Sequence, residues 1–242
     1  MLPSPPSMTS NASVRIVMEA FAAQLAAEDV ERIAFAHRLH KDVAGGMVAC
    51  ISLSEMMRHE LGQSQPGNRM SAYHAEFDAA LRQTLGVVRD LIEGLYPPVL
   101  KVFGFNAALQ QLVRFLSEAF AGSIMVQMNG EEPDLELERR LNLFRIVENL
   151  LQGCIKNADT SWLEISCQTG VDQFEISIDH DGGPAAWSTG TFLTQMPRIE
   201  ARCGLIQAQF EISASGPGAR TRGIVRVPLR PANLTGTAQK LD

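Results

Sequence analysis

Two long runs of helical periodicity, separated by one short break, constrain the fold of this chain more than any other feature of its sequence. Apolar residues recur three and four positions apart over residues 14–57 and again over residues 71–95. The break at residues 62–68 (GQSQPGN) contains two glycines and a proline, and two further prolines at residues 97–98 end the second run. The sequence therefore predicts two long amphipathic helices joined as an antiparallel hairpin, with a kink in the first helix near residues 26–31.

A hairpin of two such helices leaves apolar side chains uncovered, because each helix carries a wider apolar face than one partner helix can bury. Pairing with a second copy into a four-helix bundle is the simplest way to cover them. We therefore expect a homodimer that is held together by the hairpin.

The periodicity changes after residue 99, where shorter patterns follow one another. Helical spacing covers residues 105–120 and 135–158. Five segments have the pattern of strands: residues 123–130, 162–168, 173–180, 208–215 and 223–230. This order predicts an α+β fold, a sandwich in which a mixed sheet is backed by helices.

These patterns divide the chain into four parts. Residues 1–13 are expected to form a disordered arm, and residues 14–98 the helical hairpin. Residues 99–232 are expected to form the α/β sandwich, and residues 233–242 a tail.

The composition excludes several classes of partner and site. The formal net charge is -6 and no cluster of lysine or arginine offsets it, so we expect no nucleic acid as a partner. No apolar run approaches the length of a membrane span, and the first residues do not resemble a secretory leader, so we expect no membrane attachment. The four cysteines lie far apart among apolar residues, which predicts buried thiols in a reducing cytoplasm, with neither disulfide nor bound metal: Cys50, Cys154, Cys167 and Cys203.

The segment around His40 carries the most specific motif of the first helix. Residues 31–47 have the sequence ERIAFAHRLHKDVAGGM. This segment resembles the phosphoacceptor motif of bacterial two-component sensor histidine kinases, E-R-x-x-I-A-x-x-L-H-D-x-x-G. The corresponding residues are Glu31, Arg32, Phe35, Ala36, Leu39 and His40, with Met47 at the leucine that follows seven residues later.

Two positions depart from this motif. Lys41 stands where the family has an acidic residue that acts as a general base, and Ala44 stands where it has a glycine. Asp42 and Gly45 each lie one residue beyond those positions.

The resemblance implies that His40 is the phosphoacceptor. A neutral imidazole nitrogen exposed on a helix can attack a phosphoryl group, and a helical bundle would hold it for an in-line approach. His37 lies one turn earlier and is the alternative acceptor.

The resemblance extends over nearly the whole chain. Residues 87–116 follow the family's second helix and linker, with these residues in the expected order: Arg89, Leu95, Pro97, Leu100, Gly104 and Leu109. In this family the hairpin precedes an ATPase domain of the GHKL type, so the resemblance implies such a domain here. It also implies a homodimer and a response-regulator receiver domain as partner.

The helix that binds the nucleotide in this family departs from the family pattern. In R-I-V-x-E-A-L-x-N-A-x-K-H-A, the glutamate and the asparagine handle magnesium and catalysis. Residues 145–158 are RIVENLLQGCIKNA, which retains Lys156 but has Asn149 and Gly153 at those two positions. Glu148 lies one residue away, about 100° around the helix, and cannot simply substitute.

The adenine-binding motif D-[DN]-G-x-G departs as well. Strand alternation places His180 at its first aspartate, followed by Asp181 and Gly182. An imidazole cannot reproduce the carboxylate that accepts a hydrogen bond from adenine, and Asp179 points to the other face of the strand.

The remaining nucleotide motifs are weak. Residues 185–207 hold isolated glycines and Pro197, which is expected to interrupt a helix, and residues 215–221 (SGPGART) lack the last glycine of S-x-P-G-x-G-T. The sequence therefore predicts a degenerate ATP site that binds ATP too weakly for turnover or not at all, and no metal. Its residues are Asn149, Gly153, Lys156, His180, Asp181 and Gly182.

Three functional hypotheses follow. The first is histidine phosphotransfer without a cofactor, in which His40 accepts a phosphoryl group from one receiver domain and donates it to another, Asp42 orients the imidazole and the Lys41 ammonium offsets charge. The second is an active cytoplasmic histidine kinase that uses ATP and magnesium at an unusual site. The third is a pseudokinase scaffold that binds a receiver or a kinase without catalysis.

Overall fold

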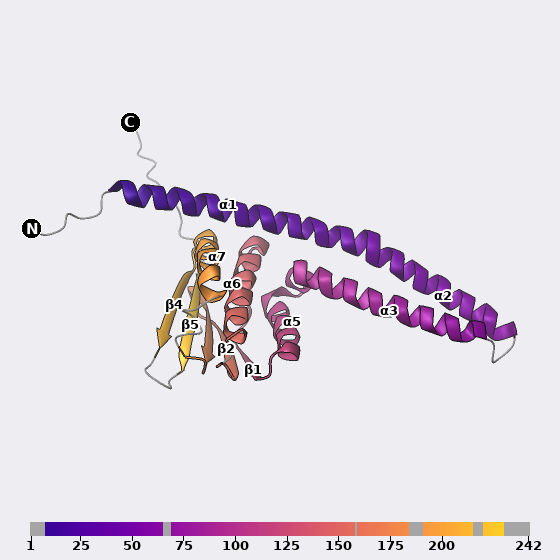
Figure 1. Cartoon of the computed structure of the whole chain (residues 1–242). Helices are drawn as coiled ribbons and strands as arrows, with labels where there is room; N and C mark the ends of the chain where they lie inside the picture. Colours follow the sequence, from indigo (N-terminus) through magenta and orange to yellow (C-terminus); the bar gives the residue numbers. More distant parts are fainter. Residues whose placement is uncertain (1–7, 65–68, 158, 184–190, 215–219, 230–242) are drawn as a thin grey trace, which may run out of the picture. The chain divides into compact units, whose positions relative to one another are not determined.

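The computed structural model describes residues 8–64, 69–157, 159–183, 191–214 and 220–229 (Figure 1). By their internal contacts the residues form two compact units. The hairpin unit is Ala26–Pro98, and the sandwich unit combines Met1–Leu25 with Val99–Asp242.

The first helical run is continuous but not regular. It comprises α1 (Met8–Arg38), a π-helical turn η1 (Leu39–Ala44) and α2 (Gly45–Ser64). The chain returns in α3 (Arg69–Leu95), which packs against η1 and α2 and confirms the predicted pair of long helices. Residues 26–31, where the sequence predicts a kink, are α-helical throughout, and the departure from α-helical geometry lies at η1.

The sandwich unit combines a mixed sheet with a layer of helices (Figure 1). Its elements are α4 (Pro98–Val102), α5 (Gly104–Ala119), β1 (Ser123–Asn129), α6 (Leu137–Ile155), β2 (Trp162–Thr169), β3 (Gln173–His180), α7 (Thr191–Ile206), β4 (Gln209–Ala214) and β5 (Thr221–Pro228). The order of the described strands is β1-β2-β3-β5-β4, with β1 parallel to β2 and the other neighbours antiparallel. The structure thus confirms the predicted α+β class.

The two faces of the sheet differ in chemistry. One face forms the core with the helices, and its most buried side chains are Leu163, Ile165, Cys167, Phe174, Ile176, Ile178, Val225 and Val227. The other face carries ion pairs between β3 and β5, from Arg222 to Asp179 and from Arg226 to Glu175, each at 2.7 Å. One apolar and one charged face explain the period-two alternation of the strands.

Two expectations about single residues are wrong. Pro197 lies inside α7 and does not interrupt it. A proline removes one backbone hydrogen bond, here to exposed Leu193, and the packing of α7 against α6 holds the helix together. Cys50 is exposed, because α2 buries only the face that carries its neighbour Ile51, whereas the other three cysteines are buried as predicted.

The ends of the chain are described only in part. α1 already begins at Met8, so residues 8–13 of the predicted arm are helical. The predicted tail, residues 233–242, lies outside the described residues. Among the helices that are described, none is long and apolar enough to cross a membrane.

Candidate functional site

His40 lies in the π turn η1 with its side chain exposed. A hydrogen bond from the Gly45 amide to the His40 carbonyl closes the turn. Ala44 is buried, whereas Lys41 and Asp42, which follow His40 in the sequence, are exposed. Within the described part of the chain, the His40 imidazole makes no hydrogen bond or ion pair, so its nitrogens are accessible to another molecule.

The alternative acceptor, His37, is exposed as well. Its neighbour Arg38 stacks over the Phe35 ring, with 5.7 Å between the guanidinium carbon and the ring centroid. Exposure therefore does not distinguish the two histidines, and the choice of His40 continues to depend on the motif.

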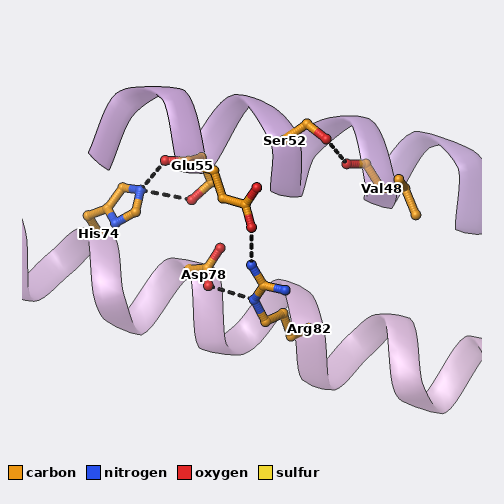
Figure 2. A network of polar contacts seen from close by, with 7 residues as sticks. Val48, Ser52, Glu55, His74, Asp78 and Arg82 are labelled. Carbon is orange, nitrogen blue, oxygen red and sulfur yellow. Dashed lines mark hydrogen bonds and ion pairs between the residues drawn. The ribbon is translucent and has the colours of Figure 1, made fainter. Parts of the chain in front are cut away.

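A polar network that the sequence analysis missed joins α2 to α3 (Figure 2). His74 is buried, and its Nε2 atom contacts both the hydroxyl and the carbonyl oxygen of Ser54. Arg82 donates to Asp78 and to Glu55 at 2.7 Å each, which lowers the pKa of Asp78 and raises that of Arg82. These contacts hold the two helices in register, and a single sequence gives no signal for them beyond the position of His74 on the buried side of α3.

Phe192 of α7 occupies the space beside Gly153, where the family pattern has its asparagine. The Phe192 side chain is 1% exposed, and a Cβ atom added at Gly153 would lie 2.8 Å from its Cδ2 atom. Two carbon atoms normally stay about 3.5–4.0 Å apart. Helices α6 and α7 therefore pack through the space that an asparagine side chain would need, so a side chain at position 153 would require the buried Phe192 ring to shift.

Other polar groups at the predicted nucleotide site differ in their surroundings. Glu148 pairs with Arg145 at 2.7 Å, and neither side chain is exposed, so a protein cation already balances this carboxylate. Asn149 is half-buried, and Lys156 is exposed at the C-terminal end of the helix.

His180 ends β3 and is fully buried. Its Nδ1 atom accepts a hydrogen bond from the Gly182 amide at 3.1 Å. Burial lowers the pKa of His180, although the charges of Asp181 and Asp179 act in the opposite direction. The imidazole is therefore mainly neutral at physiological pH and is enclosed by protein.

Asp181 binds the protein chain itself. Its carboxylate accepts hydrogen bonds from the amides of Ser161 and Trp162, at 2.8 and 3.2 Å, and from the Ser161 hydroxyl. Burial alone would raise the pKa of Asp181, but these hydrogen bonds outweigh it and hold the pKa below its usual value. The carboxylate thus stabilises the start of β2.

Asp181→Asn is expected to destabilise the sandwich unit near neutral pH. Because the folded-state pKa is lowered, the ionised carboxylate stabilises the fold above the unfolded-state pKa of about 4, and this contribution is lost as the pH falls through the folded-state value. Urea denaturation should give a larger free energy of unfolding for wild type than for Asp181→Asn. This difference should be largest near neutral pH and decrease at acidic pH. Asp159→Asn, at an exposed residue nearby, is the control. A stability difference between wild type and Asp181→Asn that does not depend on pH would contradict a stabilising role of the ionised carboxylate.

The segment that follows α6 contacts the turn after β3, which carries the predicted site residue Gly182. The Asn157 amide at the end of α6 donates to the Gly182 carbonyl at 3.1 Å, and a side chain at Gly182 would collide with Asn157 and Thr160. The two weak nucleotide motifs, residues 185–207 and 215–221, fall partly on residues 184–190 and 215–219, which lie outside the described residues. In the part of the chain that is described, no cluster of three or more potential metal ligands is found.

Comparison with known proteins finds similarity among solved structures only. No family model matches the sequence, and no curated protein matches it. The Acinetobacter baumannii histidine kinase AdeS is 11% identical with a TM-score of 0.43, over 76% of this chain and 96% of that one. The blue-light-activated histidine kinase EL346 of Erythrobacter litoralis is 13% identical with a TM-score of 0.45, over 68% of this chain and 64% of that one.

A third solved structure covers about half of the chain. The catalytic domain of the histidine kinase ThkA is 15% identical with a TM-score of 0.38, over 51% of this chain and 95% of that domain. All three of these solved structures are histidine kinases.

Proposed function

We propose that this chain is a cytoplasmic histidine phosphotransfer protein of a two-component phosphorelay, which makes little or no use of ATP. The observation that carries the proposal is the packing of Phe192 against Gly153. In the family this asparagine handles magnesium and catalysis. A chain without it is therefore expected to transfer a phosphoryl group from ATP to its own histidine slowly or not at all. His40 nevertheless remains exposed, so its phosphoryl group would come from another protein.

The chemical step is a reversible exchange between two nucleophiles. A neutral ring nitrogen of His40 attacks the phosphorus of a receiver aspartyl phosphate, a P–N bond forms, and the P–O bond to the aspartate breaks to release its carboxylate. The reverse step, with a second receiver, returns the phosphoryl group to an aspartate. Asp42 would orient the imidazole by accepting a hydrogen bond from its other nitrogen, and Lys41 would offset the charge of the phosphoryl oxygens.

The proposal includes a homodimer. Large apolar side chains are exposed on the hairpin unit and line a groove between α2 and α3: Leu53, Met56, Met57, Met70, Tyr73 and Phe77. A continuous apolar surface of this kind is unfavourable in water and favours burial against a partner. A second copy offers the same surface, and two hairpins packed through it would form a four-helix bundle.

Label transfer tests the function with wild type, His40→Ala and His37→Ala. Each protein is incubated with radiolabelled ATP and magnesium, and separately with a radiolabelled phosphorylated receiver domain from the same cell. We expect acid-labile label only from the receiver, in wild type and His37→Ala, and none in His40→Ala.

The other outcomes identify the competing functions. Label taken from ATP alone would establish a histidine kinase and contradict the role given to Phe192. Label that is taken up by His40→Ala but not by His37→Ala would identify His37 as the acceptor. Absence of label in both reactions would favour the pseudokinase scaffold. In that case the substitution His40→Ala should not change the signalling output of the protein.

A further inference from the structure

The first helical run, formed by α1, η1 and α2, has buried side chains at a seven-residue spacing before His40 and again after it. The spacing changes at the π turn that contains His40. One buried row consists of Asp29, Ala36, Ala44 and Ile51. A second row, half-buried or buried, consists of Arg32, Leu39, Met47 and Ser54. In both rows the step across the π turn is eight residues, whereas the steps on either side are seven.

The opposite helix, α3, keeps the seven-residue spacing throughout. Its two inward rows are His74, Leu81, Val88 and Leu95, and Asp78, Leu85 and Ile92. A seven-residue spacing keeps the same faces of two packed helices together. At η1 the first helical run therefore contains one residue more than a seven-residue spacing would have, in the part of the run that packs against α3.

The π turn η1 accounts for this residue. An α-helical hydrogen bond joins residues four apart, whereas the bond from Gly45 to His40 joins residues five apart. The turn thus accommodates one additional residue, and the side of α2 that faces α3 stays the same. Gly45 and Gly46 make the helix easier to distort here, and no described neighbour requires their small size, since a Cβ atom at Gly45 would lie 3.8 Å from the nearest atom and one at Gly46 would have none within 4 Å.

The sequence places the added residue at the same point. After His40 the chain continues with Asp42 and Gly45, each one residue later than in the pattern H-D-x-x-G. Without Lys41 the segment would be HDVAG, which matches the pattern in register. The shift of Asp42 and Gly45 therefore supports one added residue between His40 and Gly45, where the π turn lies, whereas Met47 matches the family leucine only in the ungapped alignment.

We propose that Lys41 is an inserted residue that the π turn absorbs, and that its ammonium group binds the phosphoryl group next to His40. Lysine carries a compact charge on a flexible stem, so it can reach an incoming phosphoryl oxygen while Asp42 supplies the carboxylate. The inserted residue would favour transfer from an anionic acyl phosphate. The binding role rests on the proposed function, whereas the insertion does not.

Single and double deletions test the insertion. Deleting Lys41 should let η1 become α-helical, leave both buried rows in place, and give a melting temperature equal to or above that of wild type. Deleting Lys41 and Asp42 together removes one residue too many, and should lower the melting temperature by about 5 °C or more. Circular dichroism and light scattering follow folding and assembly, and a single deletion that is as harmful as the double one would overturn the proposal.

Charge variants test the binding role. Lys41→Gln keeps the length of the turn and should slow label transfer from the phosphorylated receiver to His40 by about tenfold, whereas Lys41→Arg should restore most of the rate. Equal rates for wild type and Lys41→Gln would overturn the binding role. If wild type takes no label at all, the proposed function fails and the binding role fails with it, while the melting temperatures of the deletions still decide the insertion.

Discussion

Replacing Phe192 with alanine is expected to lower the free energy of unfolding of the sandwich unit by about 3–5 kcal/mol. The ring is 1% exposed, and its removal would leave a cavity between α6 and α7 that packed helices cannot fully close. Urea denaturation followed by circular dichroism measures the loss. Leu193→Ala is the matched control, because this neighbour on α7 is 56% exposed and should cost less than about 1 kcal/mol.

The complementary substitution, Gly153→Asn, places atoms where the ring already lies. We expect a loss of about 1–3 kcal/mol or more from overpacking. In the double variant Gly153→Asn/Phe192→Ala, the asparagine enters the space that the ring leaves, so the combined loss should be smaller than the sum by about 0.5–3 kcal/mol. Additive losses would contradict direct contact between the two positions. ATP binding gained by the double variant alone would show in addition that Phe192 closes the nucleotide site.

Phe77→Glu is expected to break the proposed homodimer. Phe77 is 53% exposed in the single chain and lines the apolar groove between α2 and α3. In a four-helix bundle its replacement would bury two unpaired carboxylates, one from each copy, at a cost of several kcal/mol. A cost of about 2.7 kcal/mol alone weakens dimerisation roughly a hundredfold. Sedimentation or light scattering over a range of concentrations measures the change.

Val171→Glu is the matched control for this substitution. Val171 is 89% exposed between β2 and β3 and belongs to the sandwich unit, so the same charge should leave the dimer unchanged. A wild-type protein that is monomeric at micromolar concentration, or a Phe77→Glu dimer as strong as wild type, would contradict the bundle.

Local periodicity was sufficient to predict most of the secondary structure. The segment 173–180 has the same limits as β3, because alternate burial on a sheet selects apolar residues at every second position. The helix expected at 135–158 is observed as α6 (Leu137–Ile155). The prediction at Pro197 was wrong because the sequence shows only the local loss of a backbone hydrogen bond at a proline. The packing of α7 against α6, which compensates this loss, involves a distant segment of the chain.

The candidate site was predicted less completely. The motif identified His40, and the departures at Gly153 and His180 indicated a degenerate nucleotide site. The sequence did not show what replaces the missing groups, namely the Phe192 ring beside Gly153 and the chain amides that bind Asp181. The kink was expected at residues 26–31, whereas the helix departs from α-helical geometry at the π turn, which packs against α3.

The sequence by itself determined the two long helices, the strands and the residues at which the nucleotide motifs depart from their pattern. These features depend on the period of apolar residues and on the identity of single side chains, both of which are local. Only the tertiary structure decided that Phe192 lies against Gly153, that the carboxylate of Asp181 binds the start of β2, and that residues 39–44 form a π turn. Each of these depends on contacts between segments far apart in the chain, and their geometry is not encoded in any single local pattern.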